Sequence, residues 1–318
     1  MLIIIQGPFS KNTKYLTENI ASLFPNFEII VSCYKDEINH NLPPKYKNIK
    51  FICNSDPGSE LIPPRGKPLN LKRQATTILS ACEESSEKWV IKIRSDLYIN
   101  NKILFKKAIN NFENSLSCNN PPKLITLNTG SLDIFSHYDM LFHFNDWFFI
   151  CEREVLIRNC KAIKSISESS LIEPFINSYP KNYYHAKKYR LIFHNEQLIH
   201  FADKLLKKNI IKYGCQNNKF SRYRHIIWVA KYLKLVSLRD IGIKSAKVGY
   251  PKFKSELVCI SFKSHSLHKL LISSKGFLRF FIMKILLIHG GLRKYLFLIL
   301  NNKNKLKIKL IQIKNSLI

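Results

Sequence analysis

The chain has 318 residues, of which 46% are hydrophobic and 12% aromatic, so it can bury a sizeable core and is neither disordered nor collagen-like. Its formal net charge is +29, and the excess is uneven. Residues 1–200 hold 25 basic and 19 acidic residues, whereas residues 201–318 hold 26 and 3. We therefore expect a globular domain over 1–200 and a basic C-terminal extension over 201–318, which would meet an anionic partner, either a membrane surface or nucleic acid.

The eight cysteines form neither a CxxC pair nor a tight cluster with histidines. This spacing argues against a zinc knuckle and a disulfide framework, so we expect reduced and mostly buried thiols. Residues 1–8 lack the basic leader, the long apolar stretch and the cleavage site of a secretory signal. We expect a cytoplasmic protein.

In the first hundred residues, short apolar runs alternate with helical patterns. The runs typical of buried strands are 2–5, 28–32, 49–53 and 89–93. The helical patterns run from Ser10 or Thr13 to about residue 23 and from about residue 70 to 82, and the Pro/Gly-rich stretch 56–68 indicates a long loop. This alternation predicts an α/β fold with a mostly parallel sheet flanked by helices.

The second half of the chain has weaker patterns. After residue 100 we expect a helix, a strand over 124–127, and a helix that starts near Glu152 behind the aromatic stretch 142–149. The apolar run 277–300 is interrupted by charges and by two glycines, so it predicts two interfacial amphipathic helices rather than a membrane span. Two helices that complete the core are the alternative.

Three polar segments leave the ends of the predicted strands. They are Gln6-Gly7-Pro8, Asp56-Pro57-Gly58 and Arg94-Ser95-Asp96. Because ligands of α/β sheets bind outside the carboxyl ends of the strands, we expect these segments to converge on one crevice. Asp96 is a candidate ligand for Mg²⁺ or Mn²⁺, which prefer oxygen donors, and a plain Arg-Asp pair is the alternative. Asp56 and Gly58 indicate either a structural turn or a contact to a base or ribose.

The start of the second helix carries Asn70, Lys72, Arg73 and Gln74. If Asn70 caps this helix, the two basic side chains lie in its first turn and oppose the helix dipole, which indicates either a bound anion or two solvated cations. The sequence has no phosphate loop, no GxGxxG after the first strand and no kinase motifs, which argues against ATPases and dehydrogenases. Charged residues at strand ends favour a site that grips a diphosphate.

Two later carboxylates are candidate catalytic bases. Asp146 stands beside Trp147 in the aromatic stretch, and aromatic faces suit sugar rings. Glu196 lies between His194 and His200 and could be a base, a metal ligand or a helix-start glutamate. We favour Asp146 as the base.

Seven short segments, taken in order, resemble the WavE lipopolysaccharide synthesis family. They are Ile3-Ile4-Ile5-Gln6-Gly7-Pro8, Glu28-Ile29-Ile30-Val31-Ser32, Ser55-Asp56-Pro57-Gly58, Asn70 with Arg73-Gln74, Lys92-Ile93-Arg94-Ser95-Asp96-Leu97, Asp146-Trp147-Phe148-Phe149 and Glu196-Gln197. The resemblance covers residues 1–200 and implies a GT-A-like glycosyltransferase of lipopolysaccharide or capsule assembly. The DxD metal motif of the GT-A type has arginine at its first position here, so a role for Mg²⁺ or Mn²⁺ stays open and Arg94 could itself neutralise the diphosphate.

We therefore expect an enzyme that moves a sugar from a nucleoside-diphosphate sugar to a growing lipopolysaccharide or capsular glycan. The base and ribose would lie near Gly7 and Asp56, and the diphosphate near Arg73 and Asp96. The basic extension would hold the enzyme peripherally at the inner face of the cell membrane. A nucleic-acid-binding protein that uses the basic segment is one alternative. A sugar nucleotidyltransferase, which normally has a Gly-rich basic loop after the first strand, is another.

Overall fold

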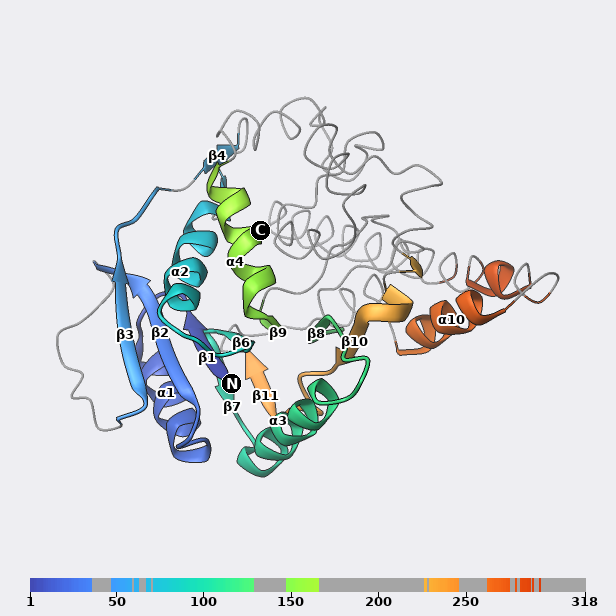
Figure 1. Cartoon of the computed structure of the whole chain (residues 1–318), viewed down its shortest axis with the longest axis horizontal. Helices are drawn as coiled ribbons and strands as arrows, with labels where there is room; N and C mark the ends of the chain where they lie inside the picture. The colour runs from blue at the N-terminus through green and yellow to red at the C-terminus, as the bar shows by residue number, and fades with distance from the viewer. Residues whose placement is uncertain are drawn as a thin grey trace, which may run out of the picture.

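The structure is a computed structural model of the whole chain (Figure 1). The residues that it describes are 1–35, 47–58, 60–62, 67–69, 71–128, 147–165, 226–227, 229–245, 262–274, 278, 281–286, 288 and 292. All structural statements below concern these residues.

A seven-stranded sheet with the order β10-β8-β9-β6-β1-β2-β3 organises the molecule. Its strands are β1 (Leu2–Gln6), β2 (Glu28–Tyr34), β3 (Ile49–Asn54), β6 (Trp89–Arg94), β8 (Leu124–Leu127), β9 (Phe148–Glu152) and β10 (Leu233–Val236). Only β9 runs antiparallel to its neighbours in this sheet; the other pairings are parallel. The predicted α/β fold with a mostly parallel sheet is confirmed.

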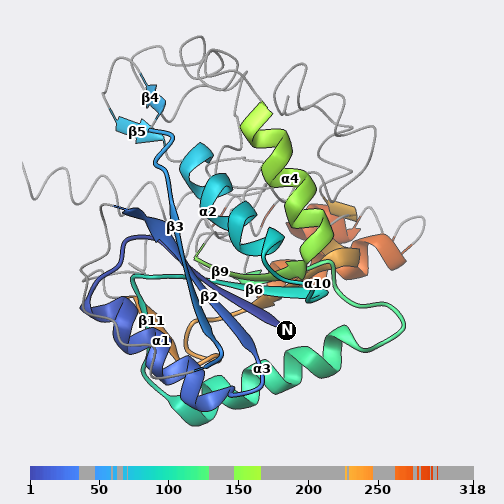
Figure 2. The ribbon, with the colours of Figure 1, turned by 60° about the vertical axis from the view of Figure 1, so that its left-hand side comes forward.

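Helices cover both faces of the sheet (Figure 2). They are α1 (Lys11–Leu23), α2 (Leu71–Glu83), α3 (Lys102–Leu116), α4 (Arg153–Ser165) and α10 (Phe262–Ser273). Successive side chains of a strand point to opposite faces, so Leu2 and Ile4 pack towards α2 and α4, while Ile3 and Ile5 belong to the cluster that contains α1 and α3 side chains. Burial on both faces explains why the strands are continuous apolar runs.

Local capping fixes where two of the helices begin. Ser10 precedes α1 and accepts a hydrogen bond from the Thr13 backbone N–H, while Thr13 Oγ1 accepts one from the Ser10 backbone N–H, which completes a capping box. Asn101 precedes α3, and its side chain accepts a bond from the Leu104 backbone N–H at 3.0 Å. Each cap satisfies backbone donors that have no partner within the helix.

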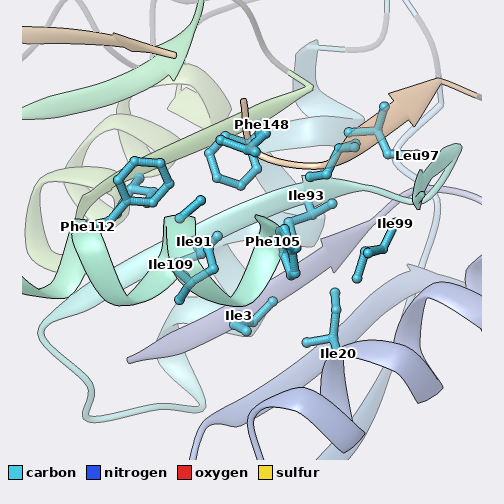
Figure 3. Packing of buried hydrophobic residues seen from close by; sticks show 14 of the residues in the cluster. Ile3, Ile20, Ile91, Ile93, Leu97, Ile99, Phe105, Ile109, Phe112 and Phe148 are labelled. Carbon is cyan, nitrogen blue, oxygen red and sulfur yellow. The ribbon is translucent and has the colours of Figure 1, made fainter. Parts of the chain in front are cut away.

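The core between the sheet and α1/α3 is rich in isoleucine and phenylalanine (Figure 3). Phe105 of α3 is fully buried, and its ring centroid lies 5.8 Å from that of Phe24 in an edge-to-face arrangement. Fully burying one such side chain stabilises the fold by about 1.5–3 kcal/mol. This packing fixes the sheet that carries the polar strand ends.

Three features differ from the sequence-based expectations. The stretch 56–68, expected to be a loop, contains the antiparallel pair β4 (Glu60–Ile62) and β5 (Lys67–Leu69). β7 (Leu97–Ile99) pairs with β11 (Ile243–Ser245), a contact between residues more than 140 positions apart that local periodicity does not contain. β9 was not predicted as a strand, because its residues resemble the end of an aromatic stretch that leads into α4.

Segments beyond residue 200 join this sheet and its core. β10 forms one edge of the sheet beside β8, and Leu271 of α10, Ile282 and Leu286 are buried in the cluster on the α2/α4 face. Leu278 and Phe281 are exposed, so the described part of the run 277–300 has one buried and one exposed side. Among the described residues, no helix is both long and apolar enough to cross a membrane. The predicted boundary at residue 200 lies outside the described residues and stays a prediction.

Candidate active site at the carboxyl edge of the sheet

The carboxyl ends of four neighbouring parallel strands lie side by side. In the register of the sheet, Gln6 of β1 pairs with Ser32 of β2 and with Arg94 of β6, and Tyr34 of β2 pairs with Asn54 of β3. The polar segments that follow these strands therefore leave the sheet at one edge. This arrangement agrees with the expected convergence, which came from the strand order of parallel sheets.

The turn after β1 packs directly against the turn after β6. Gly7 has a φ of +125°, and a Cβ built on it would lie 2.5 Å from Ser95 Oγ. The Ser95 backbone N–H donates to the Gln6 carbonyl oxygen at 2.9 Å, and Ser95 is buried. Only glycine combines this dihedral with so close a neighbour, which explains why Gly7 follows the first strand. Pro8 comes next, is exposed, and accepts a hydrogen bond from Thr13 Oγ1 at its carbonyl oxygen.

Arg94 holds Asp96 through a two-pronged ion pair. Its Nε donates to Asp96 Oδ1 at 2.5 Å and its NH2 group to Asp96 Oδ2 at 2.8 Å. The guanidinium carbon lies 4.5 Å from the centroid of the Trp147 ring, within the range of a cation–π interaction. The Arg94 backbone N–H also donates to the Trp147 carbonyl oxygen at 2.8 Å. Trp147, which follows the predicted base Asp146 in the chain, therefore lies against Arg94, the arginine predicted to bind the diphosphate.

A second ion pair joins Asp56 to Arg73, at the start of α2. Arg73 Nε donates to Asp56 Oδ1 at 2.7 Å, and its NH2 group contacts Asp56 Oδ2. The same Oδ1 accepts from the Gly58 backbone N–H at 2.9 Å, and Gly58 has a φ of +80°, so the Asp-Pro-Gly segment is a tight turn. The hydrogen bond from Arg73, supported by the one from Gly58, lowers the pKa of the Asp56 carboxyl, although partial burial opposes the shift. Asp56 is therefore the ionised partner of a cation at neutral pH.

Buried polar side chains connect the two parts of this edge. Gln6 Nε2 donates to Thr77 Oγ1 at 3.0 Å, one helical turn after Arg73. Ser32 Oγ donates to the Thr77 carbonyl oxygen at 2.7 Å and accepts from Asn54 Nδ2 at 2.9 Å. These bonds fix the start of α2 relative to the ends of β1, β2 and β3, because buried polar groups hold their geometry when they are hydrogen-bonded.

The described residues do not form a metal site. No group of three potential ligand residues that could hold a metal ion occurs among them. Both carboxylate oxygens of Asp96, the predicted Mg²⁺ or Mn²⁺ ligand, accept hydrogen bonds from Arg94. A divalent cation at Asp96 would have to displace this guanidinium, and the role predicted for Mg²⁺ or Mn²⁺ stays a prediction.

Several predicted site residues cannot be placed. Asn70, Asp146 and Glu196 lie outside the described residues. Gln74 is half-buried in the first turn of α2, where its carbonyl oxygen accepts a hydrogen bond from Thr77 Oγ1 at 3.1 Å. The roles predicted for the residues of this site in catalysis and donor binding stay predictions.

The structure adds three residues that the sequence reasoning missed. Tyr34 donates its hydroxyl to the Arg73 carbonyl oxygen at 2.6 Å, and its ring centroid lies 5.9 Å from the Arg73 guanidinium carbon. Thr77 links α2 to Gln6, as described above. Lys92 is 1% exposed, with its Nζ 5.6 Å from the centroid of the Phe149 ring. The sequence contains a signal only for Lys92, because a lysine within an apolar strand is unusual. Tyr34 and Thr77 could not be identified, because their roles depend on contacts between distant segments.

The chain matches the family described as WavE lipopolysaccharide synthesis over residues 1–254. The match extends beyond the 1–200 range of the resemblance and includes β10 and β11. It confirms the resemblance drawn from the seven short segments. A search among curated proteins gives no match.

Three of the solved structures that match this chain illustrate that the similarity is low. The bifunctional IspDF from Campylobacter jejuni has a TM-score of 0.31 and 16% identity, over 55% of this chain and 46% of that one. The galactosyltransferase LgtC in complex with donor and acceptor sugar analogs has a TM-score of 0.34 and 11% identity, over 78% and 87%. A glycosyltransferase involved in glycosylation of the major capsid of PBCV-1 has a TM-score of 0.37 and 15% identity, over 80% and 96%. This chain thus spans about half the length of the IspDF protein.

Proposed function

We infer a glycosyltransferase from one premise: the chain belongs to the WavE lipopolysaccharide synthesis family. The enzyme transfers a sugar from a nucleoside-diphosphate sugar to a lipopolysaccharide or capsular glycan acceptor. One observation supports a donor site at the carboxyl edge of the sheet. Two arginine–carboxylate ion pairs lie there, Arg73 with Asp56 and Arg94 with Asp96.

These two ion pairs contribute little to folding. The side chains of Arg73 and Asp56 are 34% and 31% exposed, and those of Arg94 and Asp96 are 20% and 28% exposed. Ion pairs that solvent reaches typically stabilise a protein by about 0–1 kcal/mol. A phosphate offers acceptor oxygens in the same two-pronged geometry as a carboxylate, so both arginines can exchange their carboxylate for a diphosphate.

The reaction requires two things of the protein. As the bond between the sugar and the diphosphate breaks, negative charge grows on the leaving diphosphate, and Arg73 and Arg94 stabilise it. The acceptor hydroxyl loses a proton when it attacks, and Asp146 takes it as the general base, with Glu196 as the second candidate. The base and ribose lie near Gly7 and Asp56. The basic residues of 201–318 hold the enzyme at the cytoplasmic face of the cell membrane, where a lipid-linked acceptor is within reach.

The decisive experiment compares donor binding by the full-length protein and four variants. Thermal shifts with UDP, GDP and CMP sugars, with and without Mn²⁺, identify the donor, because a ligand that binds the folded form raises its melting temperature. Arg73→Lys keeps the charge but loses the forked geometry, and Arg94→Ala removes both. Each should weaken donor binding about 10- to 100-fold, the effect of losing about 1.5–3 kcal/mol of charge-assisted hydrogen bonding.

The variant Asp96→Asn distinguishes a diphosphate that is bound by the Arg94 guanidinium from one that is bound through a metal on Asp96. If Arg94 grips the diphosphate, this variant binds the donor at least as tightly as the natural chain, with no dependence on Mn²⁺. A metal held by Asp96 would instead make donor binding collapse in this variant. Arg158→Lys, at an exposed position of α4, is the matched control and should change nothing. Absence of stabilisation by every nucleotide sugar would overturn the proposal, and release of pyrophosphate from a sugar phosphate and a nucleoside triphosphate would assign a nucleotidyltransferase instead.

A further inference from the structure

A pocket of about 450 Å³ is lined by residues of α3, of β10 and of the segment that follows β10, apart from the residues of the proposed donor site. Ala108, Phe112 and Val236 are among its apolar lining residues. Its charged lining residues are Lys107, Lys234, Arg239 and Asp240. The pocket thus has three positive charges, one negative charge and an apolar lining. Such a pocket suits a ligand that has both an anionic group and an apolar part.

Lys234 is the innermost of these cations. Its Nζ donates to Ser115 Oγ at 2.6 Å and lies 5.6 Å from the centroid of the Phe112 ring. Partial burial lowers the pKa of this ammonium group, and the charge of Lys269 lowers it further, while Cys118 opposes the shift. An anion seated beside Lys234 would compensate for the loss of water and for the nearby positive charge.

The first turns of α3 continue this surface. Ile103 is 81% exposed and Leu104 is 39% exposed, which is unusual for two adjacent aliphatic residues. Ile103 lies one helical turn before Lys107, and Leu104 one turn before Ala108, so these side chains share the helix face that borders the pocket. Exposed aliphatic side chains next to lysines are typical of helices that lie in the interface of a membrane.

We propose that this face of α3, together with the pocket, docks on a membrane that contains anionic phospholipid. A lipid phosphate lies between Lys107, Lys234 and Arg239, while Ile103 and Leu104 enter the boundary between headgroups and acyl chains. The proposal adds a defined membrane contact to the function proposed above, formed by α3 together with Lys234 and Arg239, and thus joins the first part of the chain to the segment 201–318. It does not depend on the reaction that the enzyme catalyses.

Co-sedimentation of the full-length protein with vesicles tests this docking surface. The natural chain should bind vesicles that contain phosphatidylglycerol and not vesicles of phosphatidylcholine alone. Ile103→Glu and Lys107→Glu change side chains that are exposed, so both variants should fold normally. Each basic residue near an anionic surface adds about 1 kcal/mol of binding, or about fivefold, so Lys107→Glu should lower vesicle partitioning at least fivefold. Ile103→Glu puts a charge on the side chain that enters the acyl-chain boundary and should lower partitioning at least as much.

Two control variants separate this surface from general charge and from the C-terminal region. Lys88→Glu makes the same change of charge at an exposed position at the amino end of β6, away from the pocket, and should lower partitioning less than twofold. Phe281→Glu changes a half-exposed aromatic side chain of the C-terminal region. If Phe281→Glu abolishes vesicle binding while Ile103→Glu leaves it unchanged, the proposal is wrong. Stabilisation by inorganic phosphate without vesicle binding would identify a site for a free anion and would also overturn it.

Discussion

Replacement of Gly7 by alanine should destabilise the fold by roughly 2–6 kcal/mol, the sum of two effects. At a φ of +125° an L-residue is strained, which costs on the order of 1–3 kcal/mol. The new Cβ would also lie 2.5 Å from Ser95 Oγ, and Ser95 is buried, so relieving this contact costs about 1–3 kcal/mol more. Urea unfolding of the natural chain and the variant measures the sum as a shift in the midpoint.

Two further variants separate strain from contact. Gly58 also has a positive φ, of +80°, but a Cβ built on it would have no atom within 4 Å, so Gly58→Ala should cost only about 1–2 kcal/mol. Adding Ser95→Ala to Gly7→Ala removes the hydroxyl and leaves the Ser95 Cβ at 3.5 Å as the nearest atom. The double variant should therefore recover the contact part and keep the strain. A Gly7→Ala protein as stable as the natural chain, or one that Ser95→Ala does not improve, would refute this account of the turn.

Two solution properties follow from burial in the core. Burial, with Lys269 nearby, lowers the pKa of His265 in the folded protein below its unfolded value of about 6.5. The stability that neutral His265 contributes is therefore complete above about pH 6.5. It is lost as the pH falls from about 6.5 towards the folded pKa, because the unfolded chain then binds the proton more tightly. His265→Gln should flatten the decline in unfolding free energy between pH 7.5 and 5.5, and an unchanged slope would contradict the prediction. Burial also raises the pKa of Cys82 to about 12, and it raises those of Cys151 and Cys160. Maleimide at pH 7, followed by peptide mass spectrometry, should label exposed Cys53 and Cys118 and reach the four buried thiols, these three and Cys33, only after unfolding.

The central strands could be predicted because each is buried on both faces and therefore forms an uninterrupted apolar run. Residues 2–5, 28–32, 49–53 and 89–93 correspond to β1, β2, β3 and β6, which are one or two residues longer at their carboxyl ends. The extra residues of β1, β3 and β6 are the polar Gln6, Asn54 and Arg94. Hydrophobicity therefore identified the strands but not their polar last residues, which lie at the edge where we propose the site.

The pairing of distant segments could not be predicted in the same way. β10 joins β8 across more than 100 residues, and four residues of a strand carry too little pattern to identify its partner. The site shows the same limit. The sequence singled out Asp56 and Arg73 separately, one for the base or ribose and one for the diphosphate, but their direct ion pair depends on how α2 packs beside β3. Of the described cysteines four are buried and two are exposed, as expected for mostly buried thiols, and their reduced state stays a prediction.

The antiparallel direction of β9 has a consequence for the site. Because β9 runs against β6, its amino end lies beside the carboxyl end of β6, and Trp147 therefore stacks on Arg94. A parallel strand in this position would place its amino end at the opposite edge of the sheet. The indole and the backbone hydrogen bond to the Trp147 carbonyl orient Arg94 independently of Asp96. If a diphosphate replaces Asp96 as we propose, the guanidinium would need no new support, and such pre-organisation would reduce the entropy lost on binding.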